Sequence, residues 1–466
     1  MSLRGIRLRN FRGFRDTSLE LAPLTVLLGP NSAGKSSFGH ALAAMAHANR
    51  EYSTGLATLT PLQRKRDEWP IDLGATLDLR TRDGVGPVCI DLMVDHGTVE
   101  FGFGEIHDRP DLVLSSLAHP SDEQNATPLE IQEQTTPRNS EQISAIIRFD
   151  KVVGALDPAI RLKRLNEVQW KDGDKDATVL LQGLVLKAVN HHPGGTPRVV
   201  SVPVANELTT LFQSLTYLRP NRNPPSRRYT EVIGTVQPIG YSGEFTSGIF
   251  HGERANAVSY LRPPNTPKTL QEAQTFPRTW SATEESLEKA VSWWLAHFNL
   301  AQNFNTVSLT GSSGEISMRV SLHDKDPHDI TEVGFGVSQI IPIVVAGLLQ
   351  RTDSLFIVDL PEAHLHPRPQ GLVADFFCSL ALSGRNVLVE THSELFFHRL
   401  RLRAAQDARL AEKIAVYFID APSHGLCSTP RRVGLDAEGE VRWPEGFLQE
   451  AWELETQIQA LRAPRS

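Results

Sequence analysis

Short apolar runs and amphipathic stretches follow one another near the start of the chain, in an order that predicts strands and then a helix. Residues 3–14 alternate apolar and polar side chains, and residues 24–28, Leu-Thr-Val-Leu-Leu, form a compact apolar run; both are typical of strands. Residues 36–48 carry Ala, Leu and Met without a proline, which predicts a helix buried against a sheet. We therefore expect strand, glycine loop and helix in that order.

The C-terminal third has the most regular pattern. It predicts two buried helices, over residues 337–349 and 370–382, and three buried strands, over residues 355–359, 386–390 and 414–419. Short apolar strands that alternate with helices are typical of a parallel α/β sheet.

The middle of the chain is less regular. Alternation over residues 73–103, with segments 77–80 and 88–94 on either side of Asp83-Gly84, predicts an antiparallel β lobe. Residues 107–142 are polar, which predicts a surface loop or partly disordered insert, with regular structure from about residue 143. Prolines and arginines cluster over 203–277, which predicts an irregular but ordered segment, and a helix is expected over 284–298.

Composition narrows the class of protein. The chain has 47 basic and 54 acidic residues and a net charge of −7, which argues against a surface coated in cations for general nucleic-acid binding. No apolar stretch approaches the roughly 20 residues needed to cross a bilayer, and no secretory signal opens the chain, so we expect a soluble, cytoplasmic protein without a membrane partner. The three cysteines, Cys89, Cys378 and Cys427, are expected to be reduced structural thiols.

A glycine-rich loop carries the strongest chemical signal. Gly29-Pro30-Asn31-Ser32-Ala33-Gly34-Lys35-Ser36 matches G-x-x-x-x-G-K-[ST] between the expected strand and helix. Backbone N–H groups from Asn31 to Ser36 are suited to wrap a β-phosphate, and Lys35 to neutralise the β and γ oxygens. The Ser36 hydroxyl is placed to ligate Mg²⁺ and Ser37 to contact the α-phosphate. We expect ATP and Mg²⁺ here.

An acidic segment follows the second buried strand of this sheet. Asp359 ends the strand over residues 355–359, where P-loop proteins hold the water shell of Mg²⁺. Glu362 is a candidate for polarising the attacking water. His364 and His366 are better explained as structural side chains, because we find no third ligand for a metal.

Two further segments complete the set of candidates. His392 follows the next strand, where ligands of α/β sheets bind, and is a candidate contact for the γ-phosphate. The run Glu332-Val-Gly334-Phe-Gly336-Val-Ser338-Gln339 opens an apolar helix with a pair of glycines that allow a phosphate to approach closely. That phosphate need not belong to the same molecule.

The order of these motifs resembles the ABC-type ATPases of the RecF, Rad50 and OLD group, and most closely the OLD-like bacterial AAA family ATPases. The resemblance is specific in the first 40 residues and over 331–395, and loose over 105–290. Five further segments contribute to the resemblance: Leu8-Arg-Asn-Phe-Arg-Gly-Phe, Trp69-Pro-Ile-Asp-Leu-Gly, Tyr217-Leu-Arg-Pro, Gly240-Tyr-Ser-Gly-Glu and Trp443-Pro-Glu-Gly-Phe.

The resemblance implies a P-loop ABC-type ATPase head of α/β class with a mixed β lobe. Its two halves, residues 1–105 and 301–466, would be separated by a large α+β insertion, residues 106–300. In this group two heads sandwich two nucleotides, which implies a homo-oligomer. Gly29 to Ser37, Asp359, Glu362 and His392 would serve one nucleotide, and Gly334, Gly336, Ser338 and Gln339 the partner's.

Two departures from the pattern affect the expected activity. Gly334 stands where the signature usually has Ser, which leaves Ser338 as a substitute hydroxyl, and Leu360 stands where the catalytic Glu often follows the strand acid. Hydrolysis would then depend on Glu362, or be slow. The OLD nucleases add a TOPRIM domain, but the 74 residues after His392 hold no Asp-x-Asp. We therefore expect a separate effector, a nuclease or a toxin.

Three functions are consistent with the sequence. The first is an ATP-dependent sensor or switch that controls this effector, in defence against phage. The second is a RecF-like, DNA-stimulated ATPase of DNA repair; Arg219, Arg222, Arg227 and Arg228 would meet phosphates in it, although an intramolecular network explains them equally well. The third is a scaffold that binds a nucleotide without hydrolysing it.

Overall fold

The structure is a computed structural model of the whole chain. It describes residues 3–51, 79–81, 84–95, 97–105, 112–118, 129–130, 159–164, 167–172, 175–182, 185–192, 198–201, 203–231, 239–266, 279–309, 314–322, 326–352, 354–420 and 427–441. The segments Trp69 to Gly74 and Trp443 to Phe447, which contribute to the family resemblance, lie outside the described residues.

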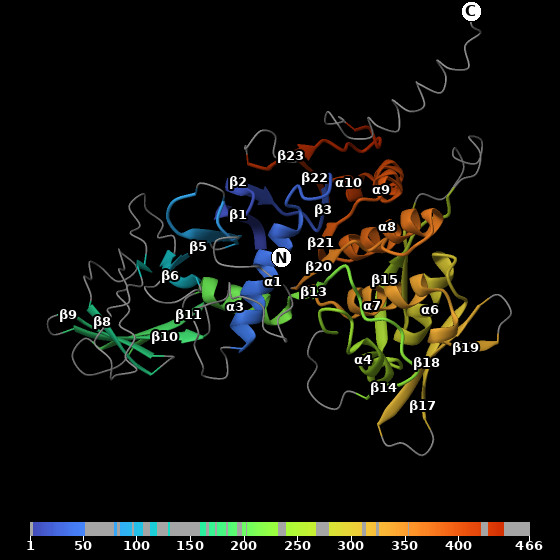
Figure 1. Ribbon diagram of the computed structural model, residues 1–466, viewed down its shortest axis with the longest axis horizontal. Coiled ribbons are helices and arrows are strands. Elements are labelled where there is room, and N and C mark those ends of the chain that lie inside the picture. Colours follow the sequence, from blue (N-terminus) through green and yellow to red (C-terminus); the bar gives the residue numbers. More distant parts are fainter. Residues whose placement is uncertain are drawn as a thin grey trace, which may run out of the picture.

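A six-stranded sheet forms the centre of the molecule and joins the two ends of the chain. Its strand order is β13 (Thr216–Leu218), β20 (Leu355–Asp359), β21 (Asn386–Glu390), β3 (Leu24–Leu28), β22 (Ile414–Asp420) and β23 (Thr429–Val433). Neighbouring strands run parallel except β22 and β23. The N-terminal strand β3 therefore lies between two C-terminal strands (Figure 1). The predicted parallel α/β sheet is confirmed.

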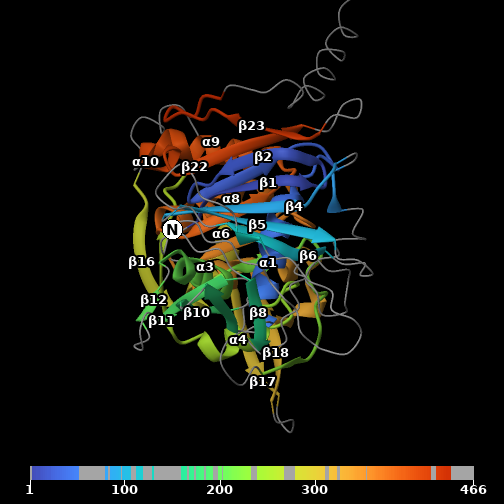
Figure 2. The ribbon, with the colours of Figure 1, turned by 90° about the vertical axis from the view of Figure 1, so that its left-hand side faces the viewer.

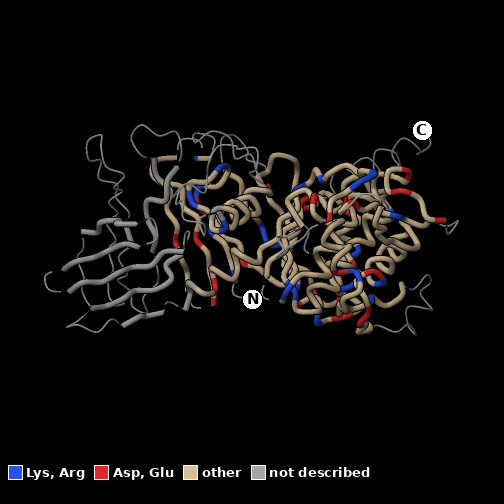
Figure 3. Tube along the Cα trace, turned by 90° about the horizontal axis from the view of Figure 1, so that it is seen from below, with Lys and Arg blue, Asp and Glu red and all other residues tan. Residues whose placement is uncertain are grey.

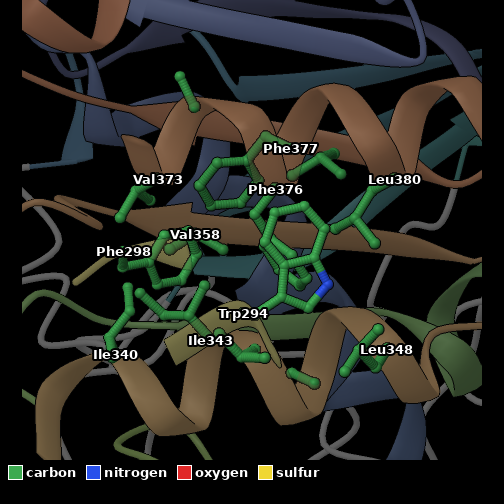
Figure 4. Packing of buried hydrophobic residues seen from close by; sticks show 14 of the residues in the cluster. Trp294, Phe298, Ile340, Ile343, Leu348, Val358, Val373, Phe376, Phe377 and Leu380 are labelled. Carbon is green, nitrogen blue, oxygen red and sulfur yellow. The ribbon is translucent and has the colours of Figure 1, made fainter. Parts of the chain in front are cut away.

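Helices cover both faces of this sheet, because its strands are apolar on both sides. Ile357 of β20 packs in one core with α1 (Ser36–Glu51) and α3 (Pro203–Ser214). Its neighbours Phe356 and Val358 pack in the other core. The longer helices of that second core are α6 (Leu287–His297), α7 (Phe335–Leu349), α8 (Pro367–Leu382) and α9 (Glu394–Gln406). In Figure 4 the indole of Trp294 lies among the side chains of α7 and α8, below Phe376 and Phe377.

A second sheet, antiparallel throughout, packs on the α1 side. Its order is β2 (Phe14–Glu20), β1 (Leu3–Phe11), β4 (Val88–Val94), β5 (Gly97–Glu105), β6 (Leu112–Ala118) and β7 (Leu129–Glu130). Leu8, Ile90 and Phe101 place it in the core that α1 shares. The antiparallel lobe was predicted, but β6 and β7 lie inside the segment predicted to be a loop. Residues 79–81 are not in a strand, contrary to the prediction for 77–80.

The middle of the chain adds three smaller sheets. The antiparallel sheet that Figure 1 places at one end of the molecule has the order β12 (Arg198–Ser201), β11 (Val185–His192), β10 (Lys175–Gln182), β9 (Glu167–Asp172) and β8 (Ala159–Arg164). Near the other end, β18 (Glu315–Ser321) pairs with β14 (Tyr229–Thr230), β17 (Asn303–Ser308) and β19 (Pro327–Asp329). The third sheet is the hairpin of β15 (Ala257–Arg262) and β16 (Ser281–Ser286). From top to bottom, Figure 2 shows the second sheet, then the sheet that contains β8 and β10–β12, and then β17 and β18.

Two predictions for the middle of the chain were partly wrong. The segment over 203–277 is more regular than expected, since it contains α3, α4 (Thr246–Glu253) and three strands. The helix predicted from residue 284 begins at Leu287, because Ser281–Ser286 forms β16 and Ser286 caps the helix by accepting a hydrogen bond from the N–H of Lys289. The remaining short helices are η2 (Ile330–Glu332) and α10 (Ala408–Ala411).

The described part of the chain has the mixed charges and moderate hydropathy that the composition predicts. Basic and acidic positions are interspersed along the described chain in Figure 3. Among the described helices, none is long and apolar enough to cross a membrane. All three cysteines are free thiols, as predicted.

Candidate nucleotide-binding site

The glycine loop between β3 and α1 has a backbone that only particular residues can adopt. Gly29 and Gly34 have φ angles of 142° and 94°, and Ser32 between them has 62°. A Cβ on Gly29 would lie 2.3 Å from the carbonyl oxygen of Ile419, and one on Gly34 would lie 3.0 Å from the ring of Phe14. Glycine is therefore required at both positions. The helix begins directly after the loop, at Ser36, so its first N–H groups face the loop.

Lys35 is a buried cation at the centre of this loop. Its side chain is 3% exposed, and its Nζ donates hydrogen bonds to the carbonyl oxygens of Gly29, at 3.1 Å, and Pro30, at 2.7 Å. The Oε1 of Glu390 lies 4.0 Å from Nζ. Burial lowers the pKa of Lys35, while the carboxylates of Glu390 and Glu362 oppose that shift. The ammonium group is thus held by neutral carbonyl oxygens of the loop, and the charged oxygens of a phosphate can replace them.

Asp359 ends β20 in a closed environment. It is 2% exposed, and its Oδ2 accepts a 2.7 Å hydrogen bond from the Tyr217 hydroxyl. The Nε2 of His40 lies 3.8 Å from the same oxygen. Burial, and then Glu390, raise the pKa of Asp359 to about 8, against the effects of Tyr217 and Arg222. Burial lowers the pKa of His40 to about 3, with a smaller effect of Arg12, so this ring is neutral near pH 7.

Glu362 and His392 meet beside the loop. The Oε1 of Glu362 accepts a 2.8 Å hydrogen bond from the backbone N–H of His392, while its Oε2 has no hydrogen-bond partner in the described part of the chain. Burial raises the pKa of Glu362, and the His392 and Thr391 hydrogen bonds oppose that shift. The His392 ring is exposed; partial burial and Lys35 lower its pKa, while a hydrogen bond with the Gly29 backbone opposes them. These contacts bring Gly29, Lys35, Glu362 and His392 together.

The predicted signature leads into α7. Its contacts run to the loop after β20, where a Cβ on Gly336 would lie 2.8 Å from the carbonyl oxygen of His364 and where the Phe335 and His364 rings meet edge to face. The buried Ser338 hydroxyl donates to the Phe335 carbonyl oxygen, and the Nε2 of Gln339 donates to Asn223. Gly334 and Phe335 are exposed, Phe335 to 41%. The side chains of Ser338 and Gln339 are thus engaged inside the head, while Gly334 and Phe335 face outward.

Three further residues belong to the site although the motifs do not identify them. Glu390 ends β21 and stands directly opposite Asp359 in the register of the two strands. Tyr217 holds Asp359, and Arg222 donates from Nη1 to the Asp359 carbonyl oxygen, at 3.3 Å, and from Nη2 to that of Leu360, at 3.1 Å. Burial lowers the pKa of Arg222 to about 10. A strand that ends in an acid was a usable signal for Glu390. The segment of Tyr217 and Arg222 stood out in the sequence, but nothing local linked either residue to Asp359.

The arginine-rich segment around Arg222 has intramolecular partners. Arg227 lies 3.7 Å from a carboxylate oxygen of Glu332, and Arg228 lies 3.3 Å from one of Glu315. The Nε of Arg219 donates to the Asn221 carbonyl oxygen. The contacts favour the intramolecular interpretation for the buried Arg222, whereas Arg227 and Arg228 are 75% and 71% exposed in surface ion pairs.

Comparison with known proteins identifies the family. A family model described as "AAA ATPase domain" matches residues 1–153 and 241–396, which is more than half of the chain. The chain belongs to the AAA ATPase domain family. No curated protein matches the sequence.

Solved structures similar to this AAA ATPase include heads of SMC proteins. The SMC head domain from Thermotoga maritima is 9% identical with a TM-score of 0.34, and the alignment covers 93% of this chain and 99% of that one. The Smc head domain with an extended coiled coil, bound to the C-terminal domain of ScpA derived from Pyrococcus furiosus, is 10% identical with a TM-score of 0.40 and coverages of 98% and 99%.

The residues of this AAA ATPase fit the ligands that P-loop ATPases generally use, ATP and Mg²⁺. The loop conformation and Lys35 suit phosphates, and Glu362 Oε2 and Glu390 Oε2 are buried oxygens without a hydrogen-bond partner among the described residues. No three His, Cys, Asp or Glu side chains in the described ranges are positioned to hold a metal by themselves. That agrees with Mg²⁺, which takes one or two carboxylates and completes its shell with phosphates and water. His364 and His366 are both exposed.

Proposed function

We propose that this chain is an ATP-dependent switch: an ATPase that works as a homo-oligomer in the cytoplasm and controls a separate effector. The observation that carries the proposal is the position of Lys35, a buried cation inside a strained glycine loop and bounded by Glu362 and Glu390. Strain at a loop of this kind is retained where the conformation is used. The head would consist of residues 1–105 and 301–466, with 106–300 as an insertion. The place of β3 between β21 and β22 supports the joining of the two ends, and β13 of the insertion adds an edge strand to the same sheet.

Phosphate binding follows from the loop. The N–H groups from Asn31 to Ser36 converge with the N-terminus of α1, where the helix dipole favours negative charge. Ser37 would contact the α-phosphate. Lys35 exchanges its two carbonyl partners for phosphate oxygens, which are stronger acceptors because they are charged. Gly29 and Gly34 allow this approach because a side chain at either position would displace the loop.

Hydrolysis would use the acids at the ends of β20 and β21. Bound Mg²⁺ supplies charge neutralisation for the β and γ phosphates. Ser36 and Asp359 would hold it, with Tyr217 fixing the carboxylate of Asp359. Glu362 would accept a proton from the attacking water through its free Oε2, since its Oε1 is held by the N–H of His392. The exposed His392 ring would contact the γ-phosphate.

The switch would lie in pairing of two heads. Gly334 and Phe335 face outward at the start of α7, so this surface is open to a nucleotide held by a second head, with Gly336, Ser338 and Gln339 supporting it from within. ATP would then favour the paired state by its additional contacts there. Slow hydrolysis would lengthen that state, and Leu360, which takes the place of an acid after Asp359, is consistent with slow turnover.

We place this switch in defence against phage, with a nuclease or toxin as effector, on the resemblance of its motifs to OLD-like ATPases. The DNA-stimulated repair alternative has less support from Arg222, because this arginine is buried and donates to backbone oxygens of the same chain. A scaffold that never hydrolyses ATP is distinguished by the experiment below.

The test compares wild type with Lys35→Ala and Glu362→Gln, and with Lys289→Ala, an exposed lysine on α6, as control. Binding of a fluorescent ATP analogue with Mg²⁺, oligomer mass by light scattering and phosphate release are measured. We expect Lys35→Ala to lose binding, Glu362→Gln to bind and pair without turnover, and Lys289→Ala to match wild type. Equal ATP binding by wild type and Lys35→Ala would refute the proposal; turnover by wild type excludes the scaffold.

A further inference from the structure

Two acids stand side by side at the carboxyl edge of the central sheet. Asp359 ends β20 and Glu390 ends β21, and the two residues are partners in the parallel register. The next strand along is β3, which leads into the glycine loop, and Glu390 pairs there with Leu27. Glu390 is therefore one strand closer to the loop than Asp359.

The carboxylate of Glu390 is buried without sufficient counter-charge. It is 8% exposed, its Oε1 lies 4.0 Å from the Nζ of Lys35, and its Oε2 has no hydrogen-bond partner in the described part of the chain. Lys35 directs its hydrogen bonds to the carbonyl oxygens of Gly29 and Pro30 instead. A buried carboxylate is costly unless a cation or hydrogen bonds satisfy it.

The same shortage extends to the neighbouring acids. Glu362 also has an unpartnered Oε2 among the described residues, and the two Nη groups of Arg222 donate to backbone carbonyl oxygens, those of Asp359 and Leu360 among them. When ionised, these three buried acids share the charge of Lys35 and Arg222, neither of which is hydrogen-bonded to a carboxylate of the three. A further cation at this edge would correct the imbalance.

We propose that Glu390 is the second acid of the magnesium site, acting together with Asp359 and the Ser36 hydroxyl. This inference rests on the proposed function, because Mg²⁺ enters with the phosphates. When Lys35 turns to the phosphates, Glu390 loses its nearest cation, and Mg²⁺ takes over that role. Mg²⁺ suits the place, since it is bound by one or two carboxylates together with phosphate oxygens and water. No second acid comes from β20, where the next residue is Leu360.

The experiment separates binding of the nucleotide from binding of the metal. Full-length wild type, Glu390→Gln and the control Glu394→Gln, an exposed acid at the start of α9, are titrated with a fluorescent ATP analogue in EDTA and then with Mg²⁺ at fixed nucleotide. In EDTA, Glu390→Gln should bind at least as tightly as wild type, because a negative charge near the phosphates is gone. The Mg²⁺ concentration at half-saturation, called here the Mg²⁺ midpoint, should rise roughly tenfold or more for this variant. Glu394→Gln should match wild type in both titrations.

Each other outcome has a distinct meaning. A Mg²⁺ midpoint of folded Glu390→Gln equal to that of wild type overturns the inference and leaves the proposed function intact. Failure of wild type to bind the analogue at all instead refutes the proposed function. If Glu390→Gln does not fold, Glu390→Asp replaces it, which keeps the charge but withdraws it by one methylene. Its midpoint should also rise, and an unchanged midpoint overturns the inference.

Discussion

Replacing Tyr217 by phenylalanine removes one hydroxyl and leaves the ring in the core between α1 and the central sheet. The lost group donates the 2.7 Å hydrogen bond to Oδ2 of Asp359, and both residues are 2% exposed. Water therefore cannot take the place of the hydroxyl without a cavity for it. A hydrogen bond to a charged group contributes about 1.5–3 kcal/mol. The Tyr217 hydroxyl opposes the raised pKa of Asp359, so its loss removes that amount of support from the ionised form to which Mg²⁺ binds.

The loss should appear in Mg²⁺-dependent ATP binding. Because each 1.4 kcal/mol is a factor of ten in an equilibrium constant, the Mg²⁺ midpoint at fixed ATP should rise roughly 10- to 100-fold at pH 7. Binding of the ATP analogue in EDTA, which depends on Lys35 and the glycine loop, should change little.

A matched control is available in the same sheet. Tyr417 of β22 is 6% exposed and donates its hydroxyl, at 2.9 Å, to the backbone oxygen of Glu20, away from the carboxylates. Tyr417→Phe tests the general cost of removing a buried tyrosine hydroxyl, and its Mg²⁺ midpoint should equal that of wild type. If folded Tyr217→Phe has the same Mg²⁺ midpoint as wild type, Mg²⁺ binding by Asp359 does not depend on the Tyr217 hydroxyl, and the prediction is refuted.

Three further predictions concern stability and the loop. Asp375→Asn should lose roughly 3–5 kcal/mol in urea unfolding, because it leaves the fully buried Arg403 without its carboxylate partner; a loss below about 1 kcal/mol contradicts this. Gly29→Ala should lose ATP binding while Gly252→Ala, which has open space around it, keeps it; equal binding by both contradicts the loop geometry. The raised pKa of Asp359 means that the folded state holds a proton which the unfolded state releases, so stability decreases as the pH rises from about 4 to about 8. Over that range the melting temperature should fall more steeply in wild type than in Asp359→Asn. Equal slopes would argue against a raised pKa.

The sequence predicts the central sheet well because its strands have clear limits. The strands over 24–28, 355–359 and 386–390 were predicted with the bounds that the structure gives them. Each is an apolar run that ends at a glycine or an acid, and burial on both faces leaves few polar positions before that end, Thr25 in β3 and Asn386 at the start of β21. The glycine loop was recognisable for the same reason, since its backbone requires glycines at fixed places.

Other parts depended on contacts that a local pattern does not contain. Tyr217 and Arg222 reach Asp359 across 142 and 137 residues of sequence, so only the fold shows that they complete the site. Strand β6, Leu112–Ala118, is a short apolar run inside a polar segment, and its pairing with β5 shows it to be a strand. The run Ser281–Ser286 contains two glutamates, which favour a helix locally, but pairing with β15 makes it a strand.

The central claim is that Lys35 couples ATP to pairing of two heads. The most direct measurement is the molar mass, by light scattering, of Glu362→Gln and of the double variant Lys35→Ala/Glu362→Gln. Each is measured with and without Mg²⁺ and ATP, and the shared Glu362→Gln substitution prevents turnover. We expect ATP to increase the mass of Glu362→Gln and to leave that of the double variant unchanged. An identical response of the two proteins to ATP would contradict it.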